Sequence, residues 1–327
     1  MSSTYDAVKD LSLEIDSYEL EPLVQEVAAN FTLHRTVVVL RGGGEEGRGE
    51  EVDYDPQTQG QLQARQAELP LVGRHTVDSF SLLQAGQTDY RRWALESAAL
   101  DLALRQAGQS LADAVGREQR PLRFVISTRT ANVPRWLELY PEARFKLDPD
   151  PTWDAELVER LAATRRVETV DFKGIYRREF GMPPDPELYA RVAEGFPEAW
   201  LEDPAITPET WPALSSHRTR ITWDAAIHEW SDVEALPFPP RSLNSKPSRF
   251  GSIRRLFDFY DACERAGIAL YGGGQFELGP GRRQIQVLAS IFHPDAPNDV
   301  APAGYNVRAP VPGLPESPLE LSPSPGF

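Results

Sequence analysis

The prediction of the fold starts from one segment, Leu243-Asn244-Ser245-Lys246-Pro247-Ser248-Arg249-Phe250-Gly251. Its first residues have the pattern of a buried strand, and this strand ends at Lys246. A turn with Pro247 and Gly251 follows and leads into the helical pattern from Ser252 to Ala266. Four earlier segments of the same type also end in charged residues: Arg144-Phe145-Lys146, Thr169-Val170-Asp171, Trp200-Leu201-Glu202-Asp203-Pro204 and Ile221-Thr222-Trp223-Asp224. The charged ends therefore follow one another as lysine, acid, acid, acid and lysine.

From Pro121 onward, short apolar runs alternate with amphipathic helical stretches such as Trp153–Thr164 and Pro186–Gly195. The runs that we predict as strands are Leu122–Ser127, Arg144–Leu147, Val167–Phe172, Ala199–Leu201, Arg220–Trp223, Ser242–Ser245 and Ile268–Tyr271. Repeated strand–helix units imply a parallel sheet with right-handed crossovers, and this many units favour a closed barrel over an open sheet. The predicted fold class is α/β, a (β/α) barrel of modified TIM type, whose chemistry would lie at the carboxyl ends of the strands.

The first 120 residues have a different pattern. Phe31–Leu40 is rich in Val and Thr and breaks at Gly42-Gly43-Gly44, which predicts a β-hairpin or meander. Between Thr88 and Gln109 the apolar residues recur at helical spacing. We therefore predict an α+β capping domain over residues 1–120 and a barrel with the active site over residues 121–299. The Pro-rich segment 300–327 is expected to pack back on the capping domain.

Charge and composition exclude several classes of function. The 327 residues include 34 Lys and Arg against 49 Asp and Glu, a formal net charge of -15, so the field of the protein would repel a nucleic acid. No apolar run approaches the roughly 18 residues that span a membrane, and we expect a cytoplasmic protein. A single cysteine, Cys263, allows neither an internal disulfide nor a thiolate metal site.

Three acids at successive strand ends, Asp171, Glu202 and Asp224, would converge above the mouth of the barrel. Hard oxygen ligands without His or Cys suit Mg²⁺ or Mn²⁺ and leave coordination positions for water or substrate. The alternative is that these are ordinary surface charges of an acidic chain. The alignment of three of them with strand ends favours the metal site.

Two lysines, Lys146 and Lys246, come from strands on either side of the acidic ones. A nearby divalent cation disfavours a protonated ammonium and lowers its pKa, which would let a lysine act as a base. If a substrate carboxylate bound the metal, its α-carbon would face one lysine and the enolate formed by proton removal would be stabilised. Each lysine alone would be read as a solvated side chain, but the pair around three acids favours catalysis.

In several of its motifs the chain resembles the enolase superfamily, in particular the muconate-lactonizing-enzyme subgroup that includes o-succinylbenzoate synthases, dipeptide epimerases and N-acylamino acid racemases. The resemblance covers most of the chain and rests on these segments: Gly47-Arg48-Gly49-Glu50, the helix from Trp93 to Gly108, Arg144-Phe145-Lys146, Leu201-Glu202-Asp203-Pro204, Asn244-Ser245-Lys246-Pro247 and Gly272-Gly273-Gly274-Gln275-Phe276-Glu277-Leu278-Gly279. Each motif alone is weak, and together they are specific. The resemblance implies an N-terminal capping domain, a barrel and a bound divalent metal.

The resemblance also implies roles for residues. Asp171, Glu202 and Asp224 would be the metal ligands, and Lys146 and Lys246 the acid/base pair. Substrate binding would fall to Lys173, Arg144, Gly273, Gly274 and Glu277. The Gly272-Gly273-Gly274 loop is expected to offer backbone N–H groups to a substrate carboxylate.

Departures from the family pattern affect the barrel's second and third strands. The first lysine of the family's Lys-x-Lys pair is Arg144 here, which shares a strand face with Lys146. In an alternative register Lys146 is the first of the pair and Asp148 the second, which puts a carboxylate in place of the base; we prefer the first register because Asp148 begins a Pro-rich turn. The third strand has Asp171-Phe172-Lys173 where the family usually has Asp-x-Asn, so Lys173 would bind a substrate carboxylate, act as a third acid/base group or neutralise the acids.

The leading functional hypothesis is a divalent-metal-dependent enzyme that abstracts the proton α to a carboxylate of a small substrate. Lys146 would be the base, with Lys246 opposite. Dehydration of the o-succinylbenzoate synthase type is favoured because the short chain and even spacing resemble that branch. The alternatives are a racemase or epimerase of N-acyl amino acids or dipeptides, a muconate-type cycloisomerase, a sugar-acid dehydratase in which Lys173 replaces the usual histidine chemistry, and a catalytically silent barrel that binds a partner. A homo-oligomeric state stays open.

Overall fold

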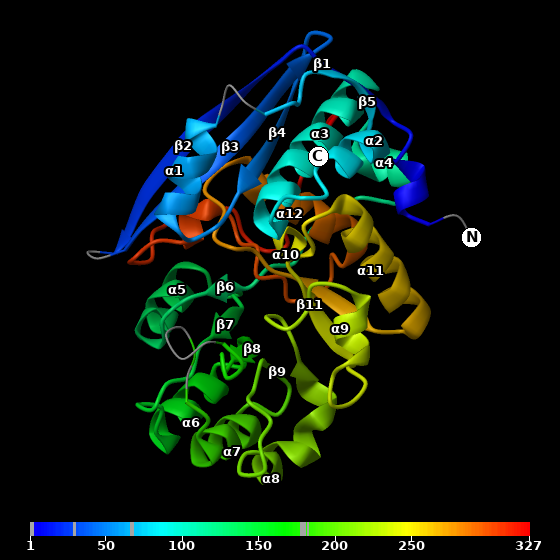
Figure 1. The fold of residues 1–327 in the computed structure, drawn as a ribbon. Coiled ribbons are helices and arrows are strands. Elements are labelled where there is room, and N and C mark those ends of the chain that lie inside the picture. The colour runs from blue at the N-terminus through cyan, green and yellow to red at the C-terminus, as the bar shows by residue number, and fades with distance from the viewer. Residues whose placement is uncertain (1–2, 29–30, 66–68, 177–180, 182) are drawn as a thin grey trace.

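The computed structural model describes residues 3–28, 31–65, 69–176, 181 and 183–327, and the rest of the predicted domains lies outside the described residues. Figure 1 shows an N-terminal antiparallel sheet with its helices set against one end of a parallel α/β barrel. The predicted fold class is confirmed.

The N-terminal part is built on a three-stranded antiparallel sheet in the order β2-β3-β4. Its elements are β1 (Ser12–Ile15), β2 (Ser17–Ala28), β3 (Phe31–Gly42), β4 (Glu45–Glu51), α1 (Pro56–Ala64), β5 (Gly73–Thr76), α2 (Val77–Leu83), α3 (Asp89–Gln106) and α4 (Leu111–Val115). β1 pairs with β5 in a second, two-stranded sheet. The predicted hairpin is confirmed: β3 and β4 are antiparallel, and Gly43 and Gly44 form the turn with φ of 59° and 81°.

The predicted helix between Thr88 and Gln109 is α3. Thr88 takes the extended N-cap conformation, and Gly108 has a left-handed φ of 65° just beyond the last turn. Residues 93–104 of α3 are all buried, because this helix lies between the sheet and the barrel.

The barrel strands are β6 (Ile126–Ser127), β7 (Phe145–Leu147), β8 (Val167–Asp171), β9 (Trp200–Glu202), β10 (Ile221–Thr222), β11 (Ser242–Ser245) and β12 (Ala269–Gly272). β6 to β10 form one parallel sheet in sequence order, and β11 pairs in parallel with β12. The N–H of Asn244 donates to the Trp223 carbonyl at 3.0 Å and joins the two sheets. Asn298 and Asp299 close the ring by bridging to Phe124 and Gly273 respectively, so this pair occupies the eighth strand position.

Helices cover the outside of the barrel: α5 (Val133–Leu139), α6 (Ala155–Ala163), α7 (Pro186–Gly195), α8 (Trp211–Leu214), α9 (Trp230–Glu234), α11 (Ile253–Ala266) and α12 (Pro280–Phe292). The short helix α10 (Pro247–Phe250), which follows β11, is buried against α3. Short 3₁₀ turns occur at Tyr5–Ala7, Thr130–Asn132, Ser215–Arg220 and Ala303–Tyr305. None of the helices in the described part of the chain is long and apolar enough to cross a bilayer.

The C-terminal segment runs along the barrel before it reaches the first domain. Leu319 exchanges two backbone hydrogen bonds with Leu122 at the start of the barrel. Further on, the carbonyl of Gly326 accepts the N–H of Leu111 at 3.2 Å, and the N–H of Phe327 donates to Asp101 of α3 at 2.9 Å. The segment thus contacts both the barrel and the N-terminal helices.

Candidate active site

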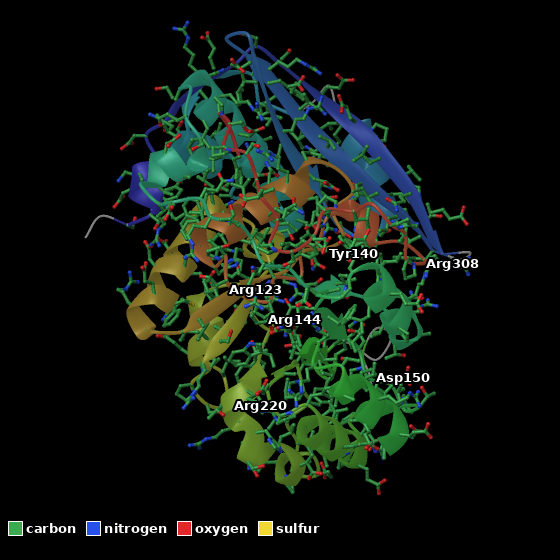
Figure 2. All side chains as sticks on the ribbon, turned by 180° about the vertical axis from the view of Figure 1, so that it is seen from behind. Arg123, Tyr140, Arg144, Asp150, Arg220 and Arg308 are labelled. Carbon is green, nitrogen blue, oxygen red and sulfur yellow. The ribbon has the colours of Figure 1, made fainter. Side chains whose placement is uncertain are left out.

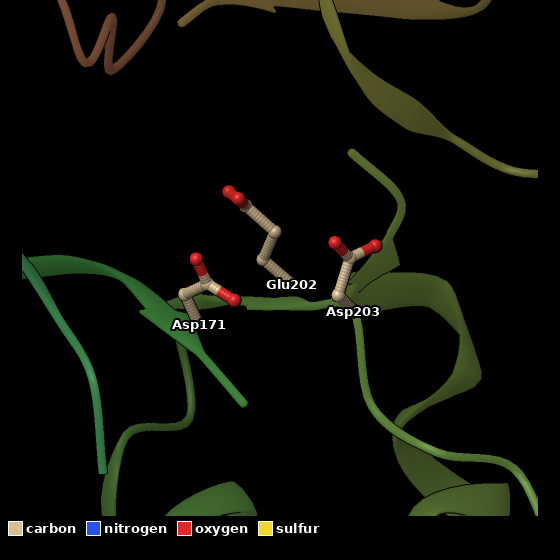
Figure 3. Close-up of side chains that lie close together, drawn as sticks. All are labelled: Asp171, Glu202 and Asp203. Atoms are coloured by element: carbon tan, nitrogen blue, oxygen red, sulfur yellow. The ribbon is translucent and has the colours of Figure 1, made fainter. Parts of the chain in front are cut away.

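Three carboxylates meet where β8 and β9 end, in a group that we call the carboxylate cluster: Asp171, Glu202 and Asp203 (Figure 3). The parallel register pairs Asp171 directly with Glu202, which brings both side chains to the same edge of the barrel. Each residue offers one oxygen, and these oxygens lie within 4.8 Å of one another. All three residues are buried, so water screens their mutual repulsion poorly.

Glu202 is held by groups from two other strands. The hydroxyl of Tyr271, on β12, donates to its Oε2 at 2.7 Å, and Nζ of Lys146, on β7, donates to Oε1 at 2.5 Å. Burial raises the pKa of Glu202 to about 8, with Lys146 opposing the rise and Asp171 adding to it. A cation beside this carboxyl would stabilise its ionised form.

Asp203 connects the end of β9 to the loop after β10. Its two carboxylate oxygens accept the backbone N–H groups of Asp224 at 2.8 Å and Ala225 at 2.9 Å. Its φ of 47° is left-handed, which turns the chain sharply so that adjacent Glu202 and Asp203 both face the cluster. Burial, followed by the charges of Asp224 and Asp171, raises the pKa of Asp203 to about 7.

Asp224 lies beside the cluster in a cationic environment. Nζ of Lys246 lies 2.6 Å from its Oδ2, and Nη1 of Arg249 lies 2.8 Å from its Oδ1. The hydroxyl of Tyr176, in the loop after β8, also donates to Oδ2 at 3.2 Å. Burial alone would raise the pKa of Asp224, but Arg249 and Lys246 outweigh it and hold the pKa below its ordinary value.

The two predicted catalytic lysines are both buried against these acids. Nζ of Lys146 lies 3.2 Å from Asp171 and 3.7 Å from Asp299, in addition to its contact with Glu202. Burial opposes the charge of Lys146, but Glu202 and Asp171 raise its pKa well above the ordinary value. Burial likewise opposes the charge of Lys246, and Asp224 raises its pKa. Both side chains are therefore ammonium ions at neutral pH in this arrangement.

Lys173 follows the end of β8 and lies near the mouth of the barrel, with its side chain 33% exposed. Its ammonium forms an ion pair with Asp148, which follows β7. Its backbone N–H donates to Oδ1 of Asp171 at 3.0 Å, and its φ of 49° is left-handed. Burial opposes the charge of Lys173, while Asp148 and then Asp171 raise its pKa.

Arg144 is not brought into the site, contrary to the prediction. It precedes β7, and its Nη1 lies 2.9 Å from Glu168 of β8 and 3.3 Å from the carbonyl of Arg165, which comes just before β8. Figure 2 shows Arg144 near Arg123. Because side chains alternate along a strand, Arg144 and Lys146 share a face of β7. Arg144, however, lies two residues nearer the start of the strand, at the amino end of the barrel, where Arg123 also contacts Glu168.

The glycine loop after β12 is packed rather than open. The N–H of Gly272 donates to Asn298 at 2.6 Å, and the N–H of Gly273 donates to the Ser245 carbonyl at 3.1 Å. Contrary to the prediction, these two N–H groups are therefore not available to a substrate carboxylate. A Cβ at Gly273 would come within 3.0 Å of Cε of Lys246, so glycine makes room for the lysine. Glu277 is buried beside Gly274 and accepts the N–H of Gln275 at 2.8 Å.

The donor set suits a hard divalent cation. Carboxylate oxygens are the ligands that Mg²⁺ and Mn²⁺ prefer, and the cluster contains neither imidazole nor thiolate. Sequence analysis selected Asp171, Glu202 and Asp224 but not Asp203, Tyr271, Arg249 or Asp299. The signal for Asp203 was present in the Glu202-Asp203-Pro204 strand end, whereas the other contacts depend on distant elements.

Comparisons with known proteins agree with this architecture. The chain aligns with the o-succinylbenzoate synthase of Bacillus subtilis (strain 168) at 25% identity over 218 residues, which are 63% of this chain and 58% of that protein. The match thus spans less than two thirds of the relative. Among solved structures, the dipeptide epimerase of Methylococcus capsulatus, complexed with Mg ion, superposes with a TM-score of 0.75 at 18% identity, covering 96% of this chain and 98% of that one.

Muconate cycloisomerase of Pseudomonas fluorescens gives a TM-score of 0.71 at 17% identity, covering 96% of this chain and 95% of that chain. The chain therefore has the capped-barrel fold of solved structures from the enolase superfamily, as the sequence motifs predicted, with a cluster of acids at its strand ends. Within that class, the chain belongs to the family described as "Domain of unknown function (DUF8230)", whose N-terminal domain matches residues 6–114 and whose C-terminal domain matches residues 118–307.

Proposed function

We propose that this protein is a divalent-metal-dependent enzyme that removes the proton α to a carboxylate of a small substrate. The observation that carries the proposal is the pairing of buried ammonium groups with buried carboxylates at the carboxyl ends of the barrel strands. Charged groups are rarely buried together without a function, because their desolvation costs several kcal/mol per ion.

Asp171 and Glu202 would hold the metal. The third ligand would be Asp224, as the sequence motifs imply, or Asp203, whose carboxylate belongs to the cluster with Asp171 and Glu202. When bound, Mg²⁺ or Mn²⁺ would supply positive charge beside a substrate carboxylate and so favour loss of the neighbouring proton.

Protein groups would then handle the proton. Lys246 stands beside Asp224 with only 10% of its side chain exposed, so it holds or moves a proton at Nζ on the β11 side with little interference from water. On the β7 side, Lys146 is the candidate from the sequence. Arg249 and Tyr176 fix Asp224, which in turn orients Lys246.

The reaction that we favour is a dehydration of the o-succinylbenzoate synthase type, because the Bacillus subtilis relative carries that name. An epimerase or racemase of dipeptides or N-acyl amino acids is the second candidate, supported by the likeness to a dipeptide epimerase. A muconate-type cycloisomerase is a third, supported by the muconate cycloisomerase neighbour. All three begin with a carboxylate substrate whose α-carbon lies between two proton-handling groups.

The first prediction is metal-dependent exchange of an α-proton. Proton NMR in D₂O, with and without Mg²⁺, would follow the cyclohexadiene precursor of o-succinylbenzoate, N-succinyl amino acids and Ala-Glu dipeptides. We expect deuterium incorporation or turnover with one of these probes, and a fall of at least about 100-fold in Lys246→Ala. Lys9→Ala, on the protein surface, is the matched control. Silence of the wild-type protein with every probe, despite Mg²⁺ binding, would exclude these substrate classes, and failure to bind Mg²⁺ would favour a catalytically silent barrel.

A further inference from the structure

The register of β7 and β8 sets the height of Lys146 in the barrel. Lys146 pairs with Thr169, and Leu147 pairs with Val170. Continued by one residue, this ladder brings Asp148 opposite Asp171, which itself pairs with Glu202. Lys146 therefore lies one inward-facing layer below the carboxylate cluster, whereas Asp148 lies level with it.

Exposure agrees with this layering. The side chain of Lys146 is 4% exposed and contacts the cluster from inside the barrel. The side chains of Asp148 and Lys173 are 45% and 33% exposed and lie at the mouth. A substrate approaching from the mouth therefore meets Asp148 and Lys173 first, whereas Lys146 is buried and its Nζ is engaged by Asp171 and Glu202.

Lys173 fixes Asp148 in place. The ammonium of Lys173 pairs with Oδ2 of Asp148, and among the described residues no partner occupies Oδ1. Lys173 is itself tied to Asp171 through its N–H and holds a left-handed backbone that long side chains seldom adopt. Strain of this kind persists where the surrounding structure enforces a functional geometry.

We propose that Asp148 is the catalytic residue that accepts the α-proton on the β7 side, that Lys173 positions it, and that Lys146 remains the counter-ion of the carboxylate cluster. This inference rests on the proposed function. In the step, the substrate C–H bond breaks, an O–H bond forms at Asp148, and the electron pair is delocalised from the α-carbon into the substrate carboxylate. The proton then returns to the substrate or leaves with the departing group.

The chemistry of Asp148 is consistent with a base. Partial desolvation among the neighbouring groups at the mouth, and then the charge of Asp171, raise the pKa of Asp148, although its side chain is 45% exposed, while Lys173 opposes the rise. In the family pattern quoted above, the second strand carries Lys-x-Lys and the third Asp-x-Asn. The register of β7 and β8 supports the alternative alignment over the one preferred from the sequence: Lys146 is then the first residue of the Lys-x-Lys pattern and Asp148 the second. A carboxylate thus stands in place of the second lysine, and Lys173 stands where the third strand of the family pattern has Asn.

The second prediction compares Asp148→Asn with Lys146→Met, using Mn²⁺ binding by electron paramagnetic resonance and α-deuterium exchange with the probe that responds in the wild type. For Asp148→Asn we expect Mn²⁺ affinity within about twofold of wild type and exchange reduced at least about 100-fold. Lys173→Met should reduce exchange less. Asp150→Asn, two residues further along and also exposed, is the matched control and should match wild type.

For Lys146→Met we expect Mn²⁺ to bind at least about tenfold more tightly, because a cation that competes for the cluster is removed. At saturating Mn²⁺ this variant should keep at least about a tenth of the exchange. Full exchange in Asp148→Asn, or abolished exchange in metal-loaded Lys146→Met, would overturn the inference and leave the proposed function standing. No exchange by the metal-loaded wild type with any probe would exclude these substrate classes and overturn this inference with them. Circular dichroism of each variant checks that it is folded.

Discussion

Among single residues, His293 makes the stability of the folded protein depend on pH, and it does so without being part of the carboxylate cluster. It ends α12, where its Nδ1 lies 2.7 Å from Oδ1 of Asn298 and its Nε2 is buried without a hydrogen-bond partner among the described residues. Burial lowers the pKa of His293 to about 4, and Asn298 opposes this only in part. The unfolded chain, with an ordinary histidine pKa near 6.5, therefore binds a proton more readily than the folded one.

The third prediction follows from that difference. The contribution of neutral His293 to stability is complete above pH 6.5 and is lost as the pH falls toward 4, so acidification from pH 7 to 5 should cost about 2 kcal/mol through this group. Urea denaturation at the two pH values measures it. His293→Gln should lose about 2 kcal/mol less than wild type, whereas the exposed His228→Gln should behave like wild type. Equal losses in wild type and His293→Gln would contradict the prediction.

Single residues of the candidate site also differ in how far the sequence predicts their positions. Strand-end acids were identified from local pattern, because a charged residue after an apolar run needs no distant information. The position of Lys146 along the barrel axis was not identified. Alternation along a strand fixes the face on which a side chain lies, but the register between strands fixes its layer in the barrel. The contact of Tyr271 with Glu202 was equally hidden, since it spans 69 residues of chain.

At the scale of elements, the close approach of β4 to α3 holds the N-terminal domain together. A Cβ at Gly49 would lie 2.0 Å from the carbonyl oxygen of Ala94, and one at Gly47 would lie 2.4 Å from that of Ala98. Glycines on one face of β4 therefore let the strand lie directly on the helix backbone. The sequence predicted both elements, but not that their contact is backbone to backbone.

The fourth prediction is that Gly49→Ala destabilises the protein by about 3 kcal/mol, because the added methyl group would overlap the backbone of Ala94 and Ala98 as well as Oγ of Ser97. Urea denaturation monitored by tryptophan fluorescence measures the loss. Gly60→Ala is the control: a Cβ there meets nothing within 4 Å, and alanine in the interior of α1 should raise stability by about 0.5–1 kcal/mol. A Gly49→Ala protein as stable as wild type would show that β4 can move away from α3.

At the scale of the whole molecule, Glu50 fastens the N-terminal domain to the barrel. Its Oε1 accepts the N–H of Leu278 at 2.6 Å, and its Oε2 accepts those of Gly279 at 2.8 Å and Gly281 at 3.1 Å. These donors surround the first turn of α12, a helix that the sequence analysis did not predict. The eighth barrel position was missed as well, because two bridging residues, Asn298 and Asp299, leave no strand pattern.

The fifth prediction concerns this connection. Glu50→Ala leaves three donors without their acceptor, which should cost several kcal/mol, roughly 1–3 for each donor that water does not reach. Differential scanning calorimetry should show a lower first transition and separate unfolding of the two domains. Glu45→Ala, at the exposed turn between β3 and β4, should unfold like wild type. A single transition at the wild-type temperature would mean that other contacts suffice to couple the domains.

The docking of the last residues on α3 has a consequence for biosynthesis. Phe327 donates its N–H to Asp101, 226 residues earlier in the chain, and its ring meets that of Trp93 edge to face. Figure 1 shows this end of the chain beside α3. On the ribosome, the helix emerges first and the segment that covers it emerges only after the entire barrel. The N-terminal domain must therefore wait, partly uncovered, through most of translation, and a chain stalled before Phe327 would expose this apolar surface of α3 to chaperones and proteases.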